Sequence, residues 1–239
     1  MIQEAIAKLV DGLHLSAGEA ERIMDQIMTG EATPAQIGGY LVALRMAGEK
    51  PEEIAGSVRS MRAKVTPVKT KHPHIVDTCG TGGDGTSTFN ISTTAAFVVA
   101  GAGQPVAKHG NRAMTSKSGS ADLLEALGAK VALTPQQVAT CVERTGIGFM
   151  FAQSFPPAMK FAGPLRPQIG IRNIFNILGP LTNPAGANCH VMGVANQEIG
   201  EKLAHALNRL GVRHALVVNG ADGLDDLTVT GESHIFEVM

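Results

Sequence analysis

Apolar positions in the N-terminal part of the chain recur at helical spacing. Ser16 and Glu19 have the spacing of a capping box, in which both side chains bond free backbone N–H groups at a helix start, and apolar residues follow at 23–28. Pro34 and Pro51 suit the first position of further helices. The pattern predicts several short helices that pack on one another or on a second subunit.

The pattern changes at residue 75, where short apolar runs begin to alternate with helical stretches. We expect strands at 75–77, 105–108, 130–133, 147–151, 190–194, 214–218 and 234–238. Such alternation predicts a mainly parallel sheet flanked by helices, with ligands at the carboxyl ends of the strands.

The predicted fold class is therefore α/β, with a small all-helical N-terminal domain and a larger domain whose mainly parallel sheet is flanked by helices. The expected domains are 1–70 (helical, with a returning helical segment at about 165–186) and 71–164 plus 187–239 (α/β). The polar segment 65–74 links them. His72 and His74 lie in this linker, and with no third ligand nearby we interpret them as solvated side chains.

Glycines follow the strand expected at 75–77. Four of the six residues from Gly80 to Gly85 are glycine, which lets the backbone approach a ligand closely and point its N–H groups at an anion. Asn90 and Ser92 then precede an apolar run, so we expect a helix that is capped by hydroxyl groups and faces a phosphate.

Cations are concentrated shortly afterwards. Lys108, Arg112 and Lys117 lie within ten residues, with no acid before Asp122, although the whole chain has a net charge of only -1. A local excess of this kind suits one highly phosphorylated small molecule, since a nucleic-acid surface spreads its cations over a face.

Two common phosphate motifs fit these glycines poorly. Gly80, Gly82 and Gly85 have the letter spacing of a dinucleotide fingerprint, which needs a helix opening at the glycines and an acid roughly 20 residues on. Here the helix is expected near Ser92, and the next strand ends in Lys108. A P-loop would need Gly-Lys-Ser/Thr at the end of the loop, which the sequence lacks.

Composition narrows the class of protein further. With 44% hydrophobic and 17% charged residues, the chain is globular. Three cysteines without a CxxC pair favour reduced thiols, and Cys79 is interpreted as a small filler. The N-terminus lacks the layout of a signal peptide and the apolar runs are too short to span a bilayer, so we expect a cytoplasmic protein without a membrane partner. No tryptophan and one tyrosine argue against stacking on nucleic acid.

Several longer sequence motifs occur along the whole chain. GTGGD, NIST, KHGNR, SKSGSADLLEALG, RPQIGIRNIFNILGPLTNPAG and GLDDLT occur in this order, and the chain resembles the anthranilate phosphoribosyltransferase family of tryptophan biosynthesis throughout. The resemblance implies a nucleoside-phosphorylase-like fold and transfer of the phosphoribosyl group from 5-phosphoribosyl diphosphate to anthranilate, with release of diphosphate. It also implies a homodimer formed through the helical domain and two Mg²⁺ ions per active site.

The resemblance assigns site residues by position. The diphosphate donor would bind at Gly80, Gly83, Asp84, Thr88, Asn90, Ile91, Ser92, Thr93, Lys108, His109, Gly110, Asn111, Arg112, Ala113, Met114, Thr115, Ser116 and Ser120. Anthranilate would bind at Gly80, Asn111 and Arg166, beside the segment 155–160, and the metal ligands would be Ser92, Asp225 and Asp226. No nucleophile or general base is expected.

Elementary chemistry supports two of these assignments. An arginine fork suits the planar carboxylate of anthranilate, although Arg166 has Arg172 close by in sequence and could instead be a surface arginine. Consecutive carboxylates at Asp225 and Asp226, after a strand, suit Mg²⁺, which prefers a few hard oxygens together with substrate phosphates.

The chain departs from the family pattern in three places. Asp226 replaces a usual glutamate, and Pro156 and Phe161 replace residues that are often histidine. Family chains also continue for roughly a hundred residues more, enough to finish a large α/β domain, so we expect either a truncated α/β domain or a shorter sheet.

Three other functions fit the sequence less well. A pyrimidine-nucleoside-phosphorylase-like enzyme would share the architecture, but the KHGNR and RPQIGIRNIFN strings argue against it. A non-catalytic relative that binds nucleic acid would need a strongly basic surface, whereas the pI is about 6.7. A helical scaffold would leave the glycines, cations and carboxylates unexplained.

Overall fold

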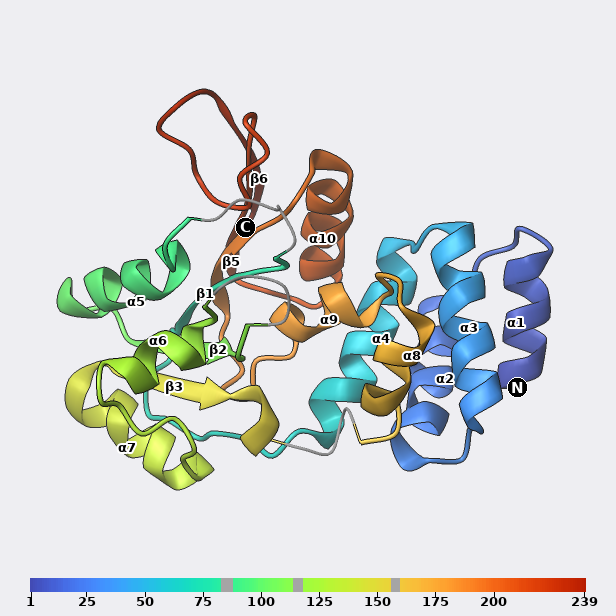
Figure 1. The fold of residues 1–239 in the computed structure, drawn as a ribbon, viewed down its shortest axis with the longest axis horizontal. Helices are drawn as coiled ribbons and strands as arrows, with labels where there is room; N and C mark the ends of the chain where they lie inside the picture. Colours follow the sequence, from blue (N-terminus) through green and yellow to red (C-terminus); the bar gives the residue numbers. More distant parts are fainter. Residues whose placement is uncertain (83–87, 114–117, 156–159) are drawn as a thin grey trace. The chain divides into compact units, whose positions relative to one another are not determined.

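The computed structural model describes residues 1–82, 88–113, 118–155 and 160–239, and it divides into two compact units. The helical unit contains residues 1–65, the described part of 156–182, and 205–211. The α/β unit contains the remaining described residues. The predicted fold class, a small helical domain with a larger domain built on a mostly parallel sheet, is confirmed (Figure 1).

Capping interactions define the starts of the helices in the helical unit. Ser16 accepts a hydrogen bond from the N–H of Glu19 at 3.3 Å, and Glu19 accepts from the N–H of Ser16 at 2.9 Å; Thr33 and Gln36 repeat the arrangement. The capping box predicted at Ser16 is thus confirmed. The elements are α1 (Ile2–Val10), α2 (Ala17–Thr29), α3 (Pro34–Ala47), α4 (Pro51–Lys64), η2 (Gly163–Leu165), α8 (Arg166–Ile169) and α9 (Phe175–Leu181).

The core of this unit is made by α2 packing on α4 and α1 packing on α3. The apolar residues at 23–28 and the single tyrosine, Tyr40, are fully buried. Polar bonds reinforce the α2–α4 contact, because Ser60 donates to Asp25 at 2.6 Å. The C-terminal end of α10, residues 205–209, also belongs here, and Arg209 pairs with Glu52.

The α/β unit is organised by one six-stranded sheet in the order β3-β2-β1-β4-β5-β6 (Figure 1). The first five strands of this order are parallel, and β6 pairs antiparallel with β5. The strands are β1 (Val76–Gly80), β2 (Val106–Gly110), β3 (Ile147–Phe151), β4 (Cys189–Gly193), β5 (His214–Gly220) and β6 (Ser233–Val238). The helices are α5 (Ile91–Gly101), α6 (Ser120–Ala126), α7 (Pro135–Thr145), the turn η1 (Ala152–Ser154) and the first part of α10 (Gln197–Arg209).

One expected strand, 130–133, is wrong. This segment connects α6 to α7 without pairing to the sheet. Its apolar character is explained by Val131, which is buried against Ala121, Leu124 and Phe151. A short apolar run can be a strand, or it can be a loop that buries one side chain. The sequence pattern alone does not distinguish the two.

No helix in the described parts of the chain is both long enough and apolar enough to cross a bilayer.

Candidate active site

The strand order reverses between β1 and β4, which makes this the topological switch point of the sheet. Gly80 and Gly193 are register partners at the carboxyl ends of these strands, and the N–H of Thr81 donates to the carbonyl of Gly193 at 2.9 Å. Ligands of open parallel sheets bind outside the strand ends at such a point. Gly80, the first residue of the glycine-rich segment, therefore lies at the strand end where a ligand site is expected.

The acidic segment reaches the same point. A Cβ on Gly80 would lie 3.2 Å from Oδ2 of Asp225, and a Cβ on Gly193 would overlap the carbonyl oxygen of Asp225. The two glycines thus allow Asp225 to approach the strand ends. Gly193 was not identified from the sequence, because its importance depends on a neighbour more than thirty residues away in the chain.

Lys108 links β2 to the start of α5. It is buried, and its Nζ donates to the carbonyl of Thr78 and to Oγ of Ser92, the latter at 3.1 Å. The hydroxyl of Thr78 donates to the carbonyl of Ser92 at 2.8 Å. Burial lowers the pKa of Lys108, and the nearby charges of Asp77 and Asp226 oppose that shift.

The first turn of α5 contains Ile91, Ser92 and Thr93, with Thr88 exposed just before it. The expected capping by hydroxyl groups is wrong: the N-cap is Asn90 and its side chain makes no capping bond. Asn90 instead donates to the carbonyl of Ser118 at 3.1 Å, which joins the two motif segments.

Two hydroxyl groups near the strand ends have no hydrogen-bond partner among the described residues. Oγ1 of Thr81 and Oγ1 of Thr93 are buried and make no hydrogen bond to any described residue. Buried polar atoms are normally satisfied. Thr81 follows Gly80 directly, and Thr93 lies in the first turn of α5.

The second motif segment continues from β2, which ends in His109 and Gly110, into Asn111, Arg112 and Ala113. Ser120 donates to the carbonyl of Asn111 at 3.4 Å. The segment is closed by Asp122, whose Oδ2 accepts from the N–H groups of Ala113 and Gly119, both at 2.9 Å. These two backbone bonds are the main cause of the lowered pKa of Asp122.

In the sequence, Asp122 was noted only as the first acidic residue after the cations and was assigned no role. Its position three residues after Gly119, at a helix start, was the available signal for a closing residue.

Arg112 forms ion pairs with two carboxylates that follow it in the chain. Its guanidinium donates to Asp122 at 3.1 Å and to Glu125 at 2.5 Å, and it lies over the ring of Phe151 at 5.4 Å. These hydrogen bonds raise its pKa. Lys108 and Arg112, grouped by the sequence, thus have different partners in the structure.

Some predicted residues cannot be placed. Lys117 and the predicted donor-site residues Gly83, Asp84, Met114, Thr115 and Ser116 lie outside the described residues, as does Pro156.

Arg166 belongs to the helical unit, where it begins α8. Its guanidinium is partly buried, and burial lowers its pKa. Phe161 lies in the same unit with its ring packed on Gly30, where a Cβ would come within 2.5 Å of the ring. The aromatic side chain at this departure from the family pattern therefore packs on the helical unit at Gly30, with 37% of its surface exposed.

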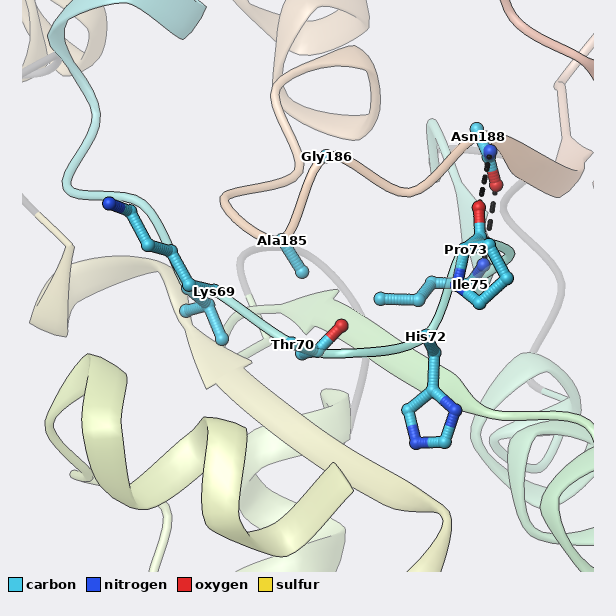
Figure 2. Close-up of a pocket in the computed structure, with 9 residues that line it drawn as sticks. Lys69, Thr70, His72, Pro73, Ile75, Ala185, Gly186 and Asn188 are labelled. Atoms are coloured by element: carbon cyan, nitrogen blue, oxygen red, sulfur yellow. Dashed lines mark hydrogen bonds between the residues drawn. The ribbon is translucent and has the colours of Figure 1, made fainter. Parts of the chain in front are cut away.

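A separate cavity of about 390 Å³ lies where residues 68–75 pass residues 185–188 (Figure 2). Asn188 fastens the two segments, because its amide donates to the carbonyl of Pro73 at 3.0 Å and its Oδ1 accepts from the N–H of Ile75 at 3.3 Å. His72 points away from Ala185 and has Glu143 at 3.7 Å. None of the described site residues lines this cavity.

Comparison with known proteins supports the two-domain description. A helical bundle domain of the glycosyl transferase family matches residues 3–65, and an a/b domain of that family matches residues 72–239. These matches define the class as a member of the glycosyl transferase family with a helical bundle domain followed by an α/β domain.

Individual relatives show which family within this class the chain belongs to. The anthranilate phosphoribosyltransferase of Moorella thermoacetica is 59% identical over 235 residues, covering 98% of this chain and 69% of the relative. That of Chloroflexus aurantiacus is 59% identical over 237 residues, covering 99% and 70%. The chain therefore belongs to the anthranilate phosphoribosyltransferase family.

Solved structures agree with this assignment. The crystal structure of the Thermus thermophilus anthranilate phosphoribosyltransferase matches with a TM-score of 0.92 at 46% identity, over 98% of this chain and 70% of that one. The Saccharomyces cerevisiae enzyme in complex with PRPP and Mg matches with a TM-score of 0.88 at 28% identity, over 100% and 72%. The nucleoside-phosphorylase-like and nucleic-acid-binding alternatives are not favoured by these comparisons.

Proposed function

We propose that this chain transfers the phosphoribosyl group of 5-phosphoribosyl diphosphate to the amine of anthranilate, giving N-(5-phosphoribosyl)anthranilate and diphosphate. One observation carries the proposal for this chain. Three parts of the described chain come together beside the carboxyl end of β1: Gly80 at the end of that strand, Lys108 with the start of α5, and Asp225 of the acidic segment. Family membership supplies the reaction.

The residues at the switch point would act mainly by binding and orienting the donor. The free backbone N–H groups in the first turn of α5 would bind a phosphate of the donor. The positive end of the helix dipole lies at the same place and favours a negative charge there. Thr81 and Thr93 supply hydroxyl groups that lack protein partners among the described residues. Lys108 supplies a buried charge close to where the leaving diphosphate becomes more negative, and such placed charges lower the barrier to its departure.

Mg²⁺ is proposed as the cofactor. The donor atoms fit, because Asp225 and Asp226 offer hard carboxylate oxygens beside the strand ends and Ser92 offers a hydroxyl oxygen. We propose that Asp225 and Asp226 hold one ion, and that Ser92 contributes to a second ion with phosphate oxygens of the donor. When bound, Mg²⁺ neutralises charge on the diphosphate.

Arg166 is proposed to orient anthranilate through its carboxylate, with Gly80 and Asn111. Partial burial of the guanidinium supports this role, since a desolvated arginine binds a carboxylate more strongly than a fully exposed one. Holding the two substrates in a fixed reactive geometry can supply most of the rate enhancement, so the proposed mechanism does not need a general base.

The test follows the loss of anthranilate fluorescence with 5-phosphoribosyl diphosphate and Mg²⁺, in a protein that has no tryptophan to interfere. We expect turnover that depends on all three additions. Folded protein that leaves the fluorescence unchanged would refute the function.

A matched pair of variants tests the acceptor site. Arg166→Ala should raise the KM for anthranilate by about 10-fold or more, the loss of a charged hydrogen bond, and leave the KM for the donor nearly unchanged. Arg172→Ala, six residues further on, is the control. If Arg172→Ala gives the larger effect on anthranilate, Arg166 is not the acceptor-binding residue.

We also propose that the chain forms a homodimer through its helical unit. Val10, Leu13 and Met46 expose 71%, 57% and 83% of their surfaces in this unit, and a dimer interface there would cover such apolar side chains. Light scattering after gel filtration should give twice the chain mass of 24.9 kDa. A single-chain mass at every concentration would contradict a dimer.

The proposed compartment is the cytoplasm. Cys79, Cys141 and Cys189 are all free thiols in the structure, the state expected in a reducing compartment. Fractionation of cells that make the tagged protein would test it, and recovery in an oxidising compartment would contradict it.

A further inference from the structure

The segment between β5 and β6, residues 221–232, contains Asp225 and Asp226, here called the acidic pair. Little of its shape comes from apolar packing, because Leu227 and Val229 expose 48% and 100% of their surfaces. A segment with few buried apolar contacts needs other bonds to hold one conformation, since ordering each residue costs conformational entropy. Hydrogen bonds supply that order here.

The residue before the acidic pair is held against the sheet. The carbonyl of Leu224 accepts from the N–H of Gly220, at the end of β5, at 2.8 Å. It also accepts at 3.4 Å from Nδ2 of Asn219, a buried amide that donates to the carbonyl of Val194, just after β4, at 2.8 Å. The chain therefore enters the acidic pair from a fixed point beside β4 and β5.

One carboxylate bonds the chain on both sides of the acidic pair. Oδ1 of Asp222 accepts from the N–H of Leu224 at 3.2 Å. Its Oδ2 accepts from the hydroxyl groups of Thr228 and Thr230, both at 2.6 Å, and these two hydroxyl groups bond each other at 2.9 Å. Asp222 thus ties position 224, before the pair, to positions 228 and 230, after it.

The two strands fix the ends of this network. A Cβ on Gly220 would lie 2.5 Å from Oδ1 of Asp222 and 3.1 Å from Cβ of Thr228, so the glycine leaves the room that the Asp222 side chain occupies. The N–H of Thr228 donates to Oγ of Ser233, the first residue of β6, at 3.1 Å. The network therefore runs from the end of β5 to the start of β6, with the acidic pair between.

We propose that Asp222 is a positioning residue for the acidic pair: its carboxylate closes the loop around Asp225 and Asp226 and so preorganises these two side chains for a divalent cation. This inference rests on the proposed Mg²⁺ site. A preorganised pair binds more tightly, because less conformational freedom is lost when the ion arrives. Three protein donors already bond Asp222, which suits a residue that orients the ligands of an ion.

The experiment titrates the protein with Mn²⁺, which takes hard oxygen ligands as Mg²⁺ does, and follows the loss of the EPR signal of the free ion. The Mg²⁺ concentration needed for half-maximal activity is measured alongside. Asp222→Ala should weaken Mn²⁺ binding by about 10- to 100-fold, as loss of a residue that orients metal ligands does. The KM for anthranilate should stay within about twofold of the wild-type value.

Thr228 offers a matched pair of variants. Thr228→Val removes only the hydroxyl group that bonds the carboxylate and should weaken Mn²⁺ binding by about 10-fold, whereas Thr228→Ser keeps the donor and should bind like the wild type. Adding Thr228→Val to Asp222→Ala should weaken binding no further, because both substitutions remove the same bond. The Thr228 pair also answers the question if Asp222→Ala does not fold.

Glu237→Gln is the control in the same pair of strands. Glu237 lies in β6, and its carboxylate is 2.8 Å from Nε2 of His214 in β5, away from the network at 219–233. The substitution removes the charge of another exposed carboxylate of this hairpin. It should leave both Mn²⁺ binding and the Mg²⁺ dependence at wild-type values.

The outcomes separate the two levels of inference. A purely structural role would lower the melting temperatures of Asp222→Ala and Thr228→Val but leave their Mn²⁺ binding unchanged, which would overturn the positioning role. Weak binding in Asp222→Ala with normal binding in Thr228→Val would make Asp222 itself a ligand, and would overturn that role too. A wild-type protein that binds no Mn²⁺ and shows no Mg²⁺-dependent turnover would instead refute the proposed metal site, before any substitution is made.

Discussion

Gly56 provides the sharpest test of the packing in the helical unit. It lies in α4 where this helix crosses α2, and it is buried. A Cβ at this position would overlap the carbonyl oxygen of Ala17, and would lie 2.9 Å from its carbonyl carbon and 3.1 Å from the backbone nitrogen of Glu21. All three atoms belong to the backbone of α2, so no side-chain rotation can relieve the overlap.

The magnitude follows from two opposing effects in Gly56→Ala. Alanine favours a helix interior over glycine by about 1 kcal/mol. Overpacking costs about 1–3 kcal/mol, and the upper end applies because helix backbones must separate. The separation would also strain the Arg59–Glu21 ion pair, now at 2.8 Å. We therefore expect a net loss of about 2 kcal/mol in the free energy of unfolding, a fall in Tm of about 4–8 °C.

The assay uses the fluorescence of Tyr40, the only tyrosine, which is buried in the same unit and therefore reports on its unfolding. Gly38→Ala in α3 is the matched control, because a Cβ there would have no heavy atom within 4 Å. The control should gain up to about 1 kcal/mol from helix propensity. The packing explanation is refuted if Gly56→Ala is as stable as the wild type, or if both variants shift in the same direction.

Three further predictions address stability and the metal site. The pKa of Asp77 is raised from 3.8 to about 6, so its contribution to stability is complete below pH 3.8 and is lost as the pH rises through 6. The unfolding free energy of the wild type minus that of Asp77→Asn should fall by about 3 kcal/mol between these limits, and a flat difference in urea titrations would contradict it. Ser16→Ala removes the helix cap of α2 and should cost about 1 kcal/mol, seen as a lower Tm; an unchanged Tm would mean that the cap contributes nothing. Gly193→Ala would push the Asp225 segment away from β4 and should raise the Mg²⁺ concentration needed for half-maximal activity, whereas an unaltered Mg²⁺ dependence would separate this segment from the metal.

Features with a local cause could be predicted from the sequence. The capping box at Ser16 needs only residues three positions apart, and it formed as expected; the helix start predicted at Pro34 also formed, with a capping box at Thr33. The strands that became β1 to β6 were found because each is a short apolar run between turn residues. The run at 130–133 failed because local pattern does not reveal whether a neighbouring strand is available to pair.

Features that depend on distant neighbours could not be predicted. Asn183 donates a hydrogen bond to Asp77 from 106 positions away, and neither has a local pattern that indicates the other. Gly193 looks like an ordinary strand end until Asp225 is placed against it. Arg112 was grouped with Lys108 by sequence proximity, but the fold gives it Asp122 and Glu125 as partners.

The pairing of β5 with β6 has a consequence for how this site can evolve. The segment between the two strands is closed at its base, where Gly220 and Ser233 are register partners and the N–H of Ala221 donates to the carbonyl of Glu232 at 2.8 Å. Insertions or exchanges inside that closed base leave the strand register unchanged, because the hairpin absorbs them. Asp225 and Asp226, the proposed Mg²⁺ ligands, lie within this segment, so their side chains can be exchanged while the pairing of β5 with β6 is kept.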